Sequence, residues 1–153
     1  MIKSLSIVFP IYNEETRLTS SFNHISSFLK TKKNFKIQMI FVDDGSRDNS
    51  VEMLQKFVKK YKKTKYNRKI QFLIIKSKIN LGKGSALKLG VKKAKNEWIL
   101  TTDIDMSVSL FQINEWIKKE MIKEKYSVYF ATRSHENSVV KRDFLRKLLG
   151  DIG

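Results

Sequence analysis

The stretch Trp98-Ile99-Leu100-Thr101-Thr102-Asp103-Ile104-Asp105-Met106-Ser107 decides the fold class of this 153-residue chain. Its first half is apolar and has the length of a buried strand, and its second half places two carboxylates in an Asp-x-Asp pattern. Ligands of an open α/β sheet bind at the carboxyl ends of its strands, where Asp103 and Asp105 stand. Two carboxylates there suit Mg²⁺ or Mn²⁺, bound together with substrate phosphates. An Asp-rich surface turn has the same composition and is the alternative interpretation.

Four further strands are predicted by short apolar runs, at residues 5–10, 37–42, 70–75 and 126–132. The only proline, Pro10, is expected to stop the first of them. Segments with apolar residues at helical spacing lie between the strands. This alternation predicts an α/β domain with a mainly parallel sheet and helices on both faces.

Two of the intervening helices carry specific expectations. Asp48 or Asn49 is expected to cap the second helix, because short polar side chains accept the unpaired N–H groups at a helix start. The third helix is expected to turn Leu87, Val91 and Ala94 toward the core, since these apolar residues fall on one helical face.

The composition excludes several kinds of chemistry. The chain has no cysteine, which excludes disulfides and thiolate catalysis, and its two histidines, His24 and His135, lie too far apart for a zinc-like pattern. An apolar content of 41% is typical of a single soluble globular domain. Neither a signal peptide nor a membrane-spanning run is visible, which predicts a cytoplasmic location.

The net charge of +16 is concentrated in residues 51–100, which carry 15 basic and 2 acidic side chains. One interpretation is a solvated helix end, and the others are attraction to anionic lipid or to nucleic-acid phosphates. Nucleic acid is less favoured, because few aromatic residues interrupt the cluster. The densest part of this cluster consists of Lys56, Lys59, Lys60, Lys62, Lys63, Lys65, Arg68 and Lys69.

Polar loops follow three predicted strands, at residues 12–15, 43–48 and 103–107, and a fourth loop at 80–85 reads Asn-Leu-Gly-Lys-Gly-Ser. The fourth loop matches neither a P-loop nor G-x-G-x-x-G, because Ser77 and Leu87 stand where these patterns need glycine. It is either a glycine turn or a helix start at which Lys83 favours a phosphate. Convergence of these loops at one sheet edge makes a nucleotide site the better explanation.

Four motifs together resemble a family-2 glycosyltransferase of the GT-A fold, in the family's order and at its usual spacing. They are residues 9–15 (Phe-Pro-Ile-Tyr-Asn-Glu-Glu), 42–48 (Val-Asp-Asp-Gly-Ser-Arg-Asp), 80–86 (Asn-Leu-Gly-Lys-Gly-Ser-Ala) and 102–105 (Thr-Asp-Ile-Asp). Residues 133–135 (Arg-Ser-His), 139–142 (Val-Val-Lys-Arg) and 144–149 make the chain most similar to the dolichyl-phosphate β-glucosyltransferase branch. Polyprenyl-phosphate mannosyl- and glucosyltransferases are close relatives of that branch.

The resemblance implies a role for each motif residue. Asp43 or Asp44 is expected to contact the base, and Lys83 to lie near the nucleotide. Asp103 is expected to face the ribose or sugar, and Asp105, with Asp103, to bind Mg²⁺ or Mn²⁺. The whole implied nucleotide-sugar site is Pro10, Tyr12, Asn13, Glu14, Asp43, Asp44, Lys83 and Asp103, and the implied catalytic residues are Asp103, Asp105 and Arg133, the last holding phosphate.

The reaction implied is transfer of glucose from UDP-glucose to a polyprenyl or dolichyl phosphate with inversion. The metal and nearby cations are expected to stabilise the charge that grows on the leaving UDP. A lipid phosphate is already ionised and needs no strong general base, in agreement with the absence of an obvious histidine for that role. GDP-mannose as donor and a glycan as acceptor are the alternatives within the same enzyme class.

The expected domains are a GT-A nucleotide-sugar-binding domain at residues 1–133 and a basic amphipathic helical segment at 134–153. That segment either packs on a core or lies on an anionic membrane surface, at the cytoplasmic face. The relatives continue with a Gln-Cys-Gly-Phe-Lys type motif that this chain lacks, so its acceptor side is expected to be incomplete. The alternatives to an enzyme are a domain that binds a nucleotide sugar or a membrane without turnover, and a nucleic-acid-binding domain.

Overall fold

The computed structural model describes residues 3–31, 36–63, 69–119, 121–122 and 126–131. Strands and helices alternate through the first 119 residues, which confirms the predicted α/β class. The elements in chain order are β1 (Ser4–Ile11), α1 (Glu15–Lys30), β2 (Lys36–Asp43), α2 (Ser50–Lys62), β3 (Ile70–Lys76), α3 (Lys83–Lys93), β4 (Trp98–Thr101) and α4 (Gln112–Lys118).

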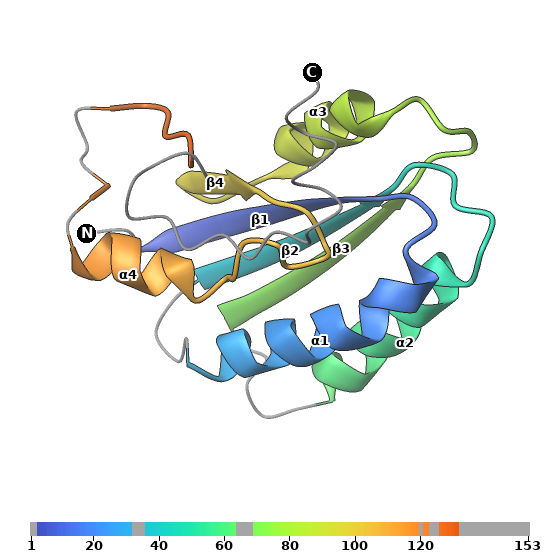
Figure 1. Cartoon of the computed structure of the whole chain (residues 1–153), viewed down its shortest axis with the longest axis horizontal. Helices are drawn as coiled ribbons and strands as arrows, with labels where there is room; N and C mark the ends of the chain where they lie inside the picture. The colour runs from blue at the N-terminus through green and yellow to red at the C-terminus, as the bar shows by residue number, and fades with distance from the viewer. Residues whose placement is uncertain (1–2, 32–35, 64–68, 120, 123–125, 132–153) are drawn as a thin grey trace, which may run out of the picture. The chain divides into compact units, whose positions relative to one another are not determined.

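The four strands form one sheet in the order β3-β2-β1-β4, and every pair is parallel (Figure 1). Leu5 of β1 lies opposite Ile37 of β2 on one side and Trp98 of β4 on the other. Because all strands run the same way, the loops that follow them leave from one edge of the sheet. The predicted convergence of those loops at one edge is confirmed.

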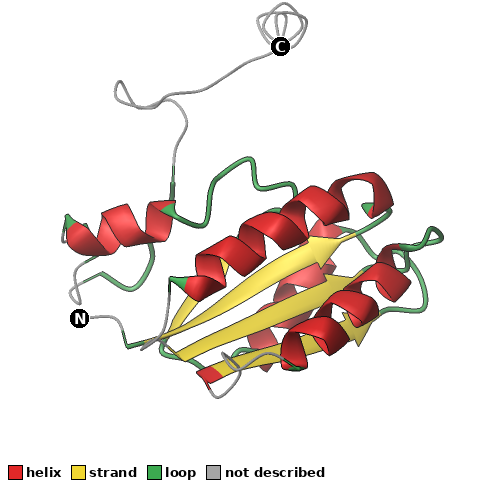
Figure 2. Ribbon diagram, turned by 90° about the horizontal axis from the view of Figure 1, so that it is seen from below, coloured by secondary structure: helices red, strands yellow, loops and turns green. Residues whose placement is uncertain are grey.

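Helices cover both faces of the sheet, as predicted. Figure 2 shows α1 and α2 crossing one face, while α3 lies behind the strands on the other. Alternate strand residues divide between the two faces because side chains of a strand point to opposite sides. The face under α1 and α2 is built around Ile7, Phe9, Met39 and Phe41, and the rings of Phe9 and Phe41 stack at 5.4 Å.

The core-facing side of α3 differs from the prediction. Val91 is 39% exposed, whereas Ala86 and Gly90 are the buried residues of this helix. Leu87 and Ala94 are partly buried against the same core, so two of the three predicted positions contact it.

The reason is the short distance between α3 and the sheet. A Cβ added at Gly90 would lie 2.3 Å from Val8 Cγ1 and 3.0 Å from Val42 Cγ2. Only a residue without a side chain fits there, and small residues at positions four apart let the helix approach β1 and β2 closely. Ranking positions by hydrophobicity misses such a contact.

The ends of two elements also differ from the predictions. Strand β1 continues through Pro10, which lies opposite Val42, and ends one residue later. Pro10 is tolerated because β4 has already ended opposite Val8, so position 10 has a partner strand on one side only. At the start of α2, Asn49 occupies the N-cap position without a side-chain cap, and Asp48 Oδ1 accepts the Ser50 N–H at 3.0 Å.

The contacts divide the chain into residues 1–119 and 120–153. In the second unit the strand predicted at 126–132 does not form over the described residues 126–131. An apolar run becomes a strand only where a neighbour accepts its backbone hydrogen bonds, and here Phe130 is 92% exposed. Arg133, the predicted helix over 139–149 and the predicted boundary at 133 lie outside the described residues. None of the described helices is long and apolar enough to span a bilayer.

Candidate functional site

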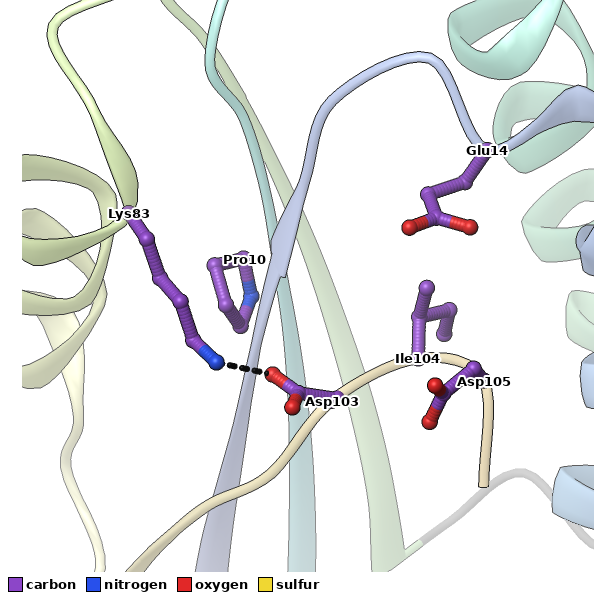
Figure 3. Close-up of a pocket in the computed structure, with 6 residues that line it drawn as sticks. All are labelled: Pro10, Glu14, Lys83, Asp103, Ile104 and Asp105. Carbon is purple, nitrogen blue, oxygen red and sulfur yellow. Dashed lines mark ion pairs between the residues drawn. The ribbon is translucent and has the colours of Figure 1, made fainter. Parts of the chain in front are cut away.

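A pocket of about 250 Å³ lies at the carboxyl edge of the sheet, beside the ends of β1 and β4 (Figure 3). The strand order reverses at β1, since β2 lies on one side of it and β4 on the other. Such a switch point is where open α/β sheets bind their ligands. The pocket is lined by Pro10, Glu14, Lys83, Asp103, Ile104 and Asp105.

The Asp-x-Asp segment is anchored by its middle residue. Ile104 is buried and its carbonyl accepts a hydrogen bond from the Ser21 hydroxyl, while Asp103 and Asp105 on either side are exposed. Ser107 donates its N–H and its hydroxyl to Asp105 Oδ1, at 2.9 and 2.7 Å. The two carboxylates therefore line the pocket from a loop that α1 holds through Ser21 and that Ser107 closes locally on Asp105.

Two cations lie against the pocket's carboxylates. Lys83 Nζ, at the start of α3, is 2.6 Å from Asp103 Oδ1 (Figure 3). Arg17 Nη1 donates to both oxygens of Glu14, at 3.1 and 2.9 Å. This hydrogen bond and charge, with a further contribution from Asp105, raise the pKa of Arg17. Arg17 was not predicted from the sequence, although its position three residues after Glu14 on a helix is a signal for such a pair.

Three carboxylates line the pocket. Arg17 binds that of Glu14, while Asp103 and Asp105, separated by Ile104, are the two that the sequence analysis expected to bind a metal. Among the described residues no group of three or more His, Asp or Glu side chains is arranged to hold a metal ion. Mg²⁺ commonly uses one or two carboxylates and takes its other ligands from water and substrate phosphates. Asp103 and Asp105 therefore fit a cation that binds together with a diphosphate, and they do not form a complete metal site by themselves.

A second pocket, also of about 250 Å³, lies among the loops that follow β1, β2 and β3. Gly45 has φ +80°, and a Cβ there would lie 2.8 Å from the Ile79 carbonyl carbon, so glycine is needed for the two loops to touch. Tyr12, a predicted site residue, contributes a half-exposed ring. The full lining is Tyr12, Gly45, Ser46, Arg47, Ser77, Lys78, Ile79 and Asn80.

The residues 77–79 of this pocket were missed by the sequence analysis. Their signal was their position directly after a strand, at the same edge as the other loops. No motif covers them, so only the parallel topology identifies them.

Asn13, a predicted ligand contact, joins two loops through its hydrogen bonds. Its N–H donates to Ser46 Oγ at 2.9 Å, and its side-chain oxygen accepts the Arg47 N–H at 2.8 Å. Its φ of 52° is in the left-handed region, which asparagine tolerates better than most residues. Asn13 lines neither pocket, and its contacts assign it a positioning role.

A second set of hydrogen bonds joins the same parts of the chain at the residues that directly follow, Glu14 and Glu15 on one side and residues 48–50 on the other. Glu14 N–H donates to Ser50 Oγ at 2.8 Å, and Glu15 N–H to Asp48 Oδ2 at 3.0 Å. Asn49 donates its N–H and its amide back to the Glu15 carboxylate, at 3.1 and 2.7 Å. Burial acts to raise the pKa of Asp48, but the hydrogen bonds from Ser50 and Glu15 outweigh it and hold that pKa below its usual range.

Asp43 and Asp44 are both buried, with 2% and 3% of their surface exposed. Asp44 accepts the Leu81 N–H on Oδ1 at 3.0 Å and the Gly82 N–H on Oδ2 at 2.7 Å. Both oxygens of Asp43 face the single Ser46 N–H, each at 3.3 Å. Neither aspartate is among the residues that line the two pockets, and the contacts of both hold loops in place.

The parallel sheet of this order, covered on both faces, has the GT-A fold. Solved structures agree with this fold. Staphylococcus aureus TarS in complex with UDP matches with a TM-score of 0.58 and 20% identity, over 89% of this chain and 43% of that one. A mannosyltransferase from Pyrobaculum calidifontis in complex with GDP-Man and Mn²⁺ matches with a TM-score of 0.60 and 16% identity, over 74% and 31%.

Residues 6–149 match the Glycosyl transferase family 2 profile, and the chain belongs to this family. Similar curated proteins are dolichyl-phosphate beta-glucosyltransferases. That of Dictyostelium discoideum is 31% identical over 95% of this chain and 45% of its own length, and that of Saccharomyces cerevisiae is 31% identical over 95% and 46%. The human protein is 29% identical over 96% and 47%. The chain therefore spans less than half the length of these relatives.

Proposed function

We propose that this chain binds a nucleoside-diphosphate sugar, UDP-glucose, across the two pockets and passes glucose to a polyprenyl phosphate. The observation that carries the proposal is the pocket at the switch strand, where Asp103, Asp105 and Lys83 meet. The similarity to dolichyl-phosphate beta-glucosyltransferases supports the choice of sugar and acceptor. Peripheral contact with an anionic membrane is the setting in which such a lipid acceptor would be met.

In this proposal the base lies in the second pocket, against the Tyr12 ring, and the diphosphate extends toward Lys83 and the first turn of α3. A helix start favours phosphate, because its unpaired N–H groups and its dipole both attract negative charge. Arg47 and Lys78, which line the base pocket, add positive charge near the nucleotide. The loops that follow β2 and β3 lie between the two pockets in this proposal, and the hydrogen bonds of Asn13 and Asp44 hold them in place.

Asp103 and Asp105 would hold Mg²⁺ or Mn²⁺ on the diphosphate. Such a cation supplies Lewis acidity that stabilises charge on a leaving phosphate oxygen. Lys83 adds a fixed positive charge beside Asp103, where the same negative charge develops. An oxygen of the acceptor phosphate attacks the anomeric carbon, the bond from that carbon to the UDP oxygen breaks, and UDP leaves with the bonding electrons.

The test is calorimetric titration of UDP-glucose into the chain, with and without Mn²⁺, using the wild type and Asp105→Ala. We expect metal-dependent binding that Asp105→Ala reduces at least tenfold, because one of the two carboxylate ligands is lost. Glu97→Ala is the matched control, since it removes an exposed carboxylate at the opposite end of β4. Failure of UDP-glucose and UDP to bind under any condition contradicts the proposal, and tighter binding of GDP-mannose assigns a different donor.

A further inference from the structure

Residues 76–95 carry seven lysines and no acidic residue. They form the loop between β3 and α3, the whole of α3 and the residues just after it. We name this the lysine surface, and its members are the exposed Lys76, Lys78, Lys83, Lys88, Lys92, Lys93 and Lys95 with the exposed aliphatic residues Ile79, Leu81 and Val91. In Figure 1 the loop leads from the end of β3 to the start of α3, on the side of the sheet away from α1 and α2.

The solvent face of α3 is uniform in charge. Ala86 and Gly90 are buried, so Lys88, Val91 and Lys92 lie on the opposite side by helical spacing. A solvated helix ordinarily carries both signs of charge, as α2 does where Lys56 pairs with Glu52 at 2.6 Å. Residues 76–95 contain no carboxylate that could offset these lysines. Lys83 pairs with Asp103 from another loop, and the remaining lysines form a one-sign surface suited to an anionic partner.

The aliphatic side chains indicate which anionic partner fits. Ile79 is 64% and Leu81 is 62% exposed, and both stand between lysines in the loop before α3. Large aliphatic side chains beside lysines match a bilayer interface, where the chains enter the headgroup region and the ammonium groups meet the phosphates. Nucleic-acid surfaces use aromatic stacking, and residues 76–95 contain no Phe, Tyr or Trp.

We propose that the lysine surface docks the chain on an anionic lipid bilayer. This inference rests on the proposed function, in which the acceptor is a lipid. Lys83 lines the first pocket and Ile79 the second, so a docked surface would bring both pockets to the lipid headgroups. It differs from the expectation drawn from charge density alone, which pointed to the cluster between Lys56 and Lys69, of which Lys56, Lys59, Lys60 and Lys62 lie on α2. The α2 helix covers the other face of the sheet.

The geometry predicts which lysines contribute to binding. Layers of a domain are about 10 Å apart, so α2 is about 20 Å behind a bilayer that contacts α3. The screening length at physiological salt is about 8 Å, so the α2 lysines are largely screened from that bilayer. Each lysine at an anionic surface contributes a factor of roughly 5.4 in affinity, so removal of two from α3 is expected to weaken binding about 30-fold.

The test is sedimentation of the full 153-residue chain with sucrose-loaded vesicles of phosphatidylcholine, with and without phosphatidylserine, at physiological salt. We expect binding that requires phosphatidylserine and falls about 30-fold in Lys88→Gln/Lys92→Gln. The matched control Lys59→Gln/Lys60→Gln removes the same charge from α2 and is expected to change binding less than about twofold. Leu81→Ser is expected to remove the part of the binding that resists high salt, since it exchanges an aliphatic side chain for a polar one.

Several outcomes overturn the inference: no binding to phosphatidylserine vesicles, equal losses in both double variants, or a larger loss in the α2 variant. Preference for a single-stranded oligonucleotide over vesicles, lost in Lys88→Gln/Lys92→Gln, reassigns the surface to nucleic acid. Melting temperatures of all variants exclude unfolding as the cause. UDP-glucose titration of Lys88→Gln/Lys92→Gln without vesicles separates the two proposals, because donor binding by this variant is expected to be unchanged when its vesicle binding is lost.

Discussion

The adjacent aspartates Asp43 and Asp44 differ in what an isosteric Asn substitution would cost. Asp44 accepts two different N–H groups, one on each oxygen. In Asp44→Asn one of them, at Leu81 or Gly82, would face an amide NH₂ and lose its acceptor in a buried site. In Asp43→Asn the single Ser46 N–H keeps an oxygen to donate to.

The magnitudes follow from these contacts. A hydrogen bond to a charged group contributes about 1.5–3 kcal/mol, and an unsatisfied buried N–H costs about 1–3 kcal/mol. Asp44→Asn loses one such bond and weakens the other, so we expect it to destabilise the chain by about 2–4 kcal/mol. Asp43→Asn keeps its bond and removes a buried charge, and we expect a change within about 1 kcal/mol of zero.

Urea unfolding at neutral pH, followed by the fluorescence of the two tryptophans, measures both free energies of unfolding. At about 2–4 °C per kcal/mol, Asp44→Asn should also lower the melting temperature by roughly 5–15 °C. Equal losses in the two variants, or a larger loss in Asp43→Asn, would refute the assignment of the Leu81 and Gly82 bonds to Asp44. An Asp44→Asn protein as stable as the wild type would do the same.

Two further predictions concern α3 and α1. Gly90→Ala is expected to destabilise the chain by about 1–3 kcal/mol, because its Cβ would overlap Val8. Gly84→Ala is the matched control: its Cβ meets nothing within 4 Å, and it is expected to raise stability by up to about 1 kcal/mol. Urea midpoints measure both changes, and an equal effect of the two variants contradicts the packing described. Burial lowers the pKa of His24 below 6.5, and its Nε2 accepts the Leu110 N–H at 3.1 Å. The stability supplied by neutral His24 is therefore present above pH 6.5 and lost as pH falls through its lowered pKa. Melting temperatures measured from about pH 5 to pH 8 should show this loss in the wild type and less of it in His24→Gln. Melting temperatures that fall equally in both proteins would contradict the prediction.

The fold was predictable because its main signals are local and repeated. Alternating apolar strands and amphipathic helices admit few arrangements, and parallel order follows from the crossover helices. The strand predicted at 126–132 does not form over the described residues 126–131, since hydrophobicity alone does not say whether a neighbouring strand is present to pair with it. The error at Val91 has a related cause, because the buried position of α3 was set by the distance to Val8 and not by side-chain size.

The candidate site was predictable at the level of loops and less so at the level of residues. Asp103, Asp105, Lys83, Glu14 and Pro10 meet in one pocket, as the convergence of strand ends predicted. Asn13, Asp43 and Asp44 do not line it, because a short motif does not state whether a polar side chain faces a ligand or a neighbouring loop. That choice depends on which N–H groups the fold brings within reach.

The hydrogen bonds between the loops explain why the motifs contain polar residues that line neither pocket. In residues 42–48, the side chains of Asp43, Asp44 and Asp48 accept N–H groups of three different loops, while residues 45–47 line the second pocket. A loop rich in unpaired N–H groups is held firmly by carboxylates, since each oxygen accepts a charge-assisted bond. These contacts hold the loops in place, so substitutions at these residues should weaken donor binding through loop order. A motif match therefore identifies the site, and the contacts must assign the role of each residue within it.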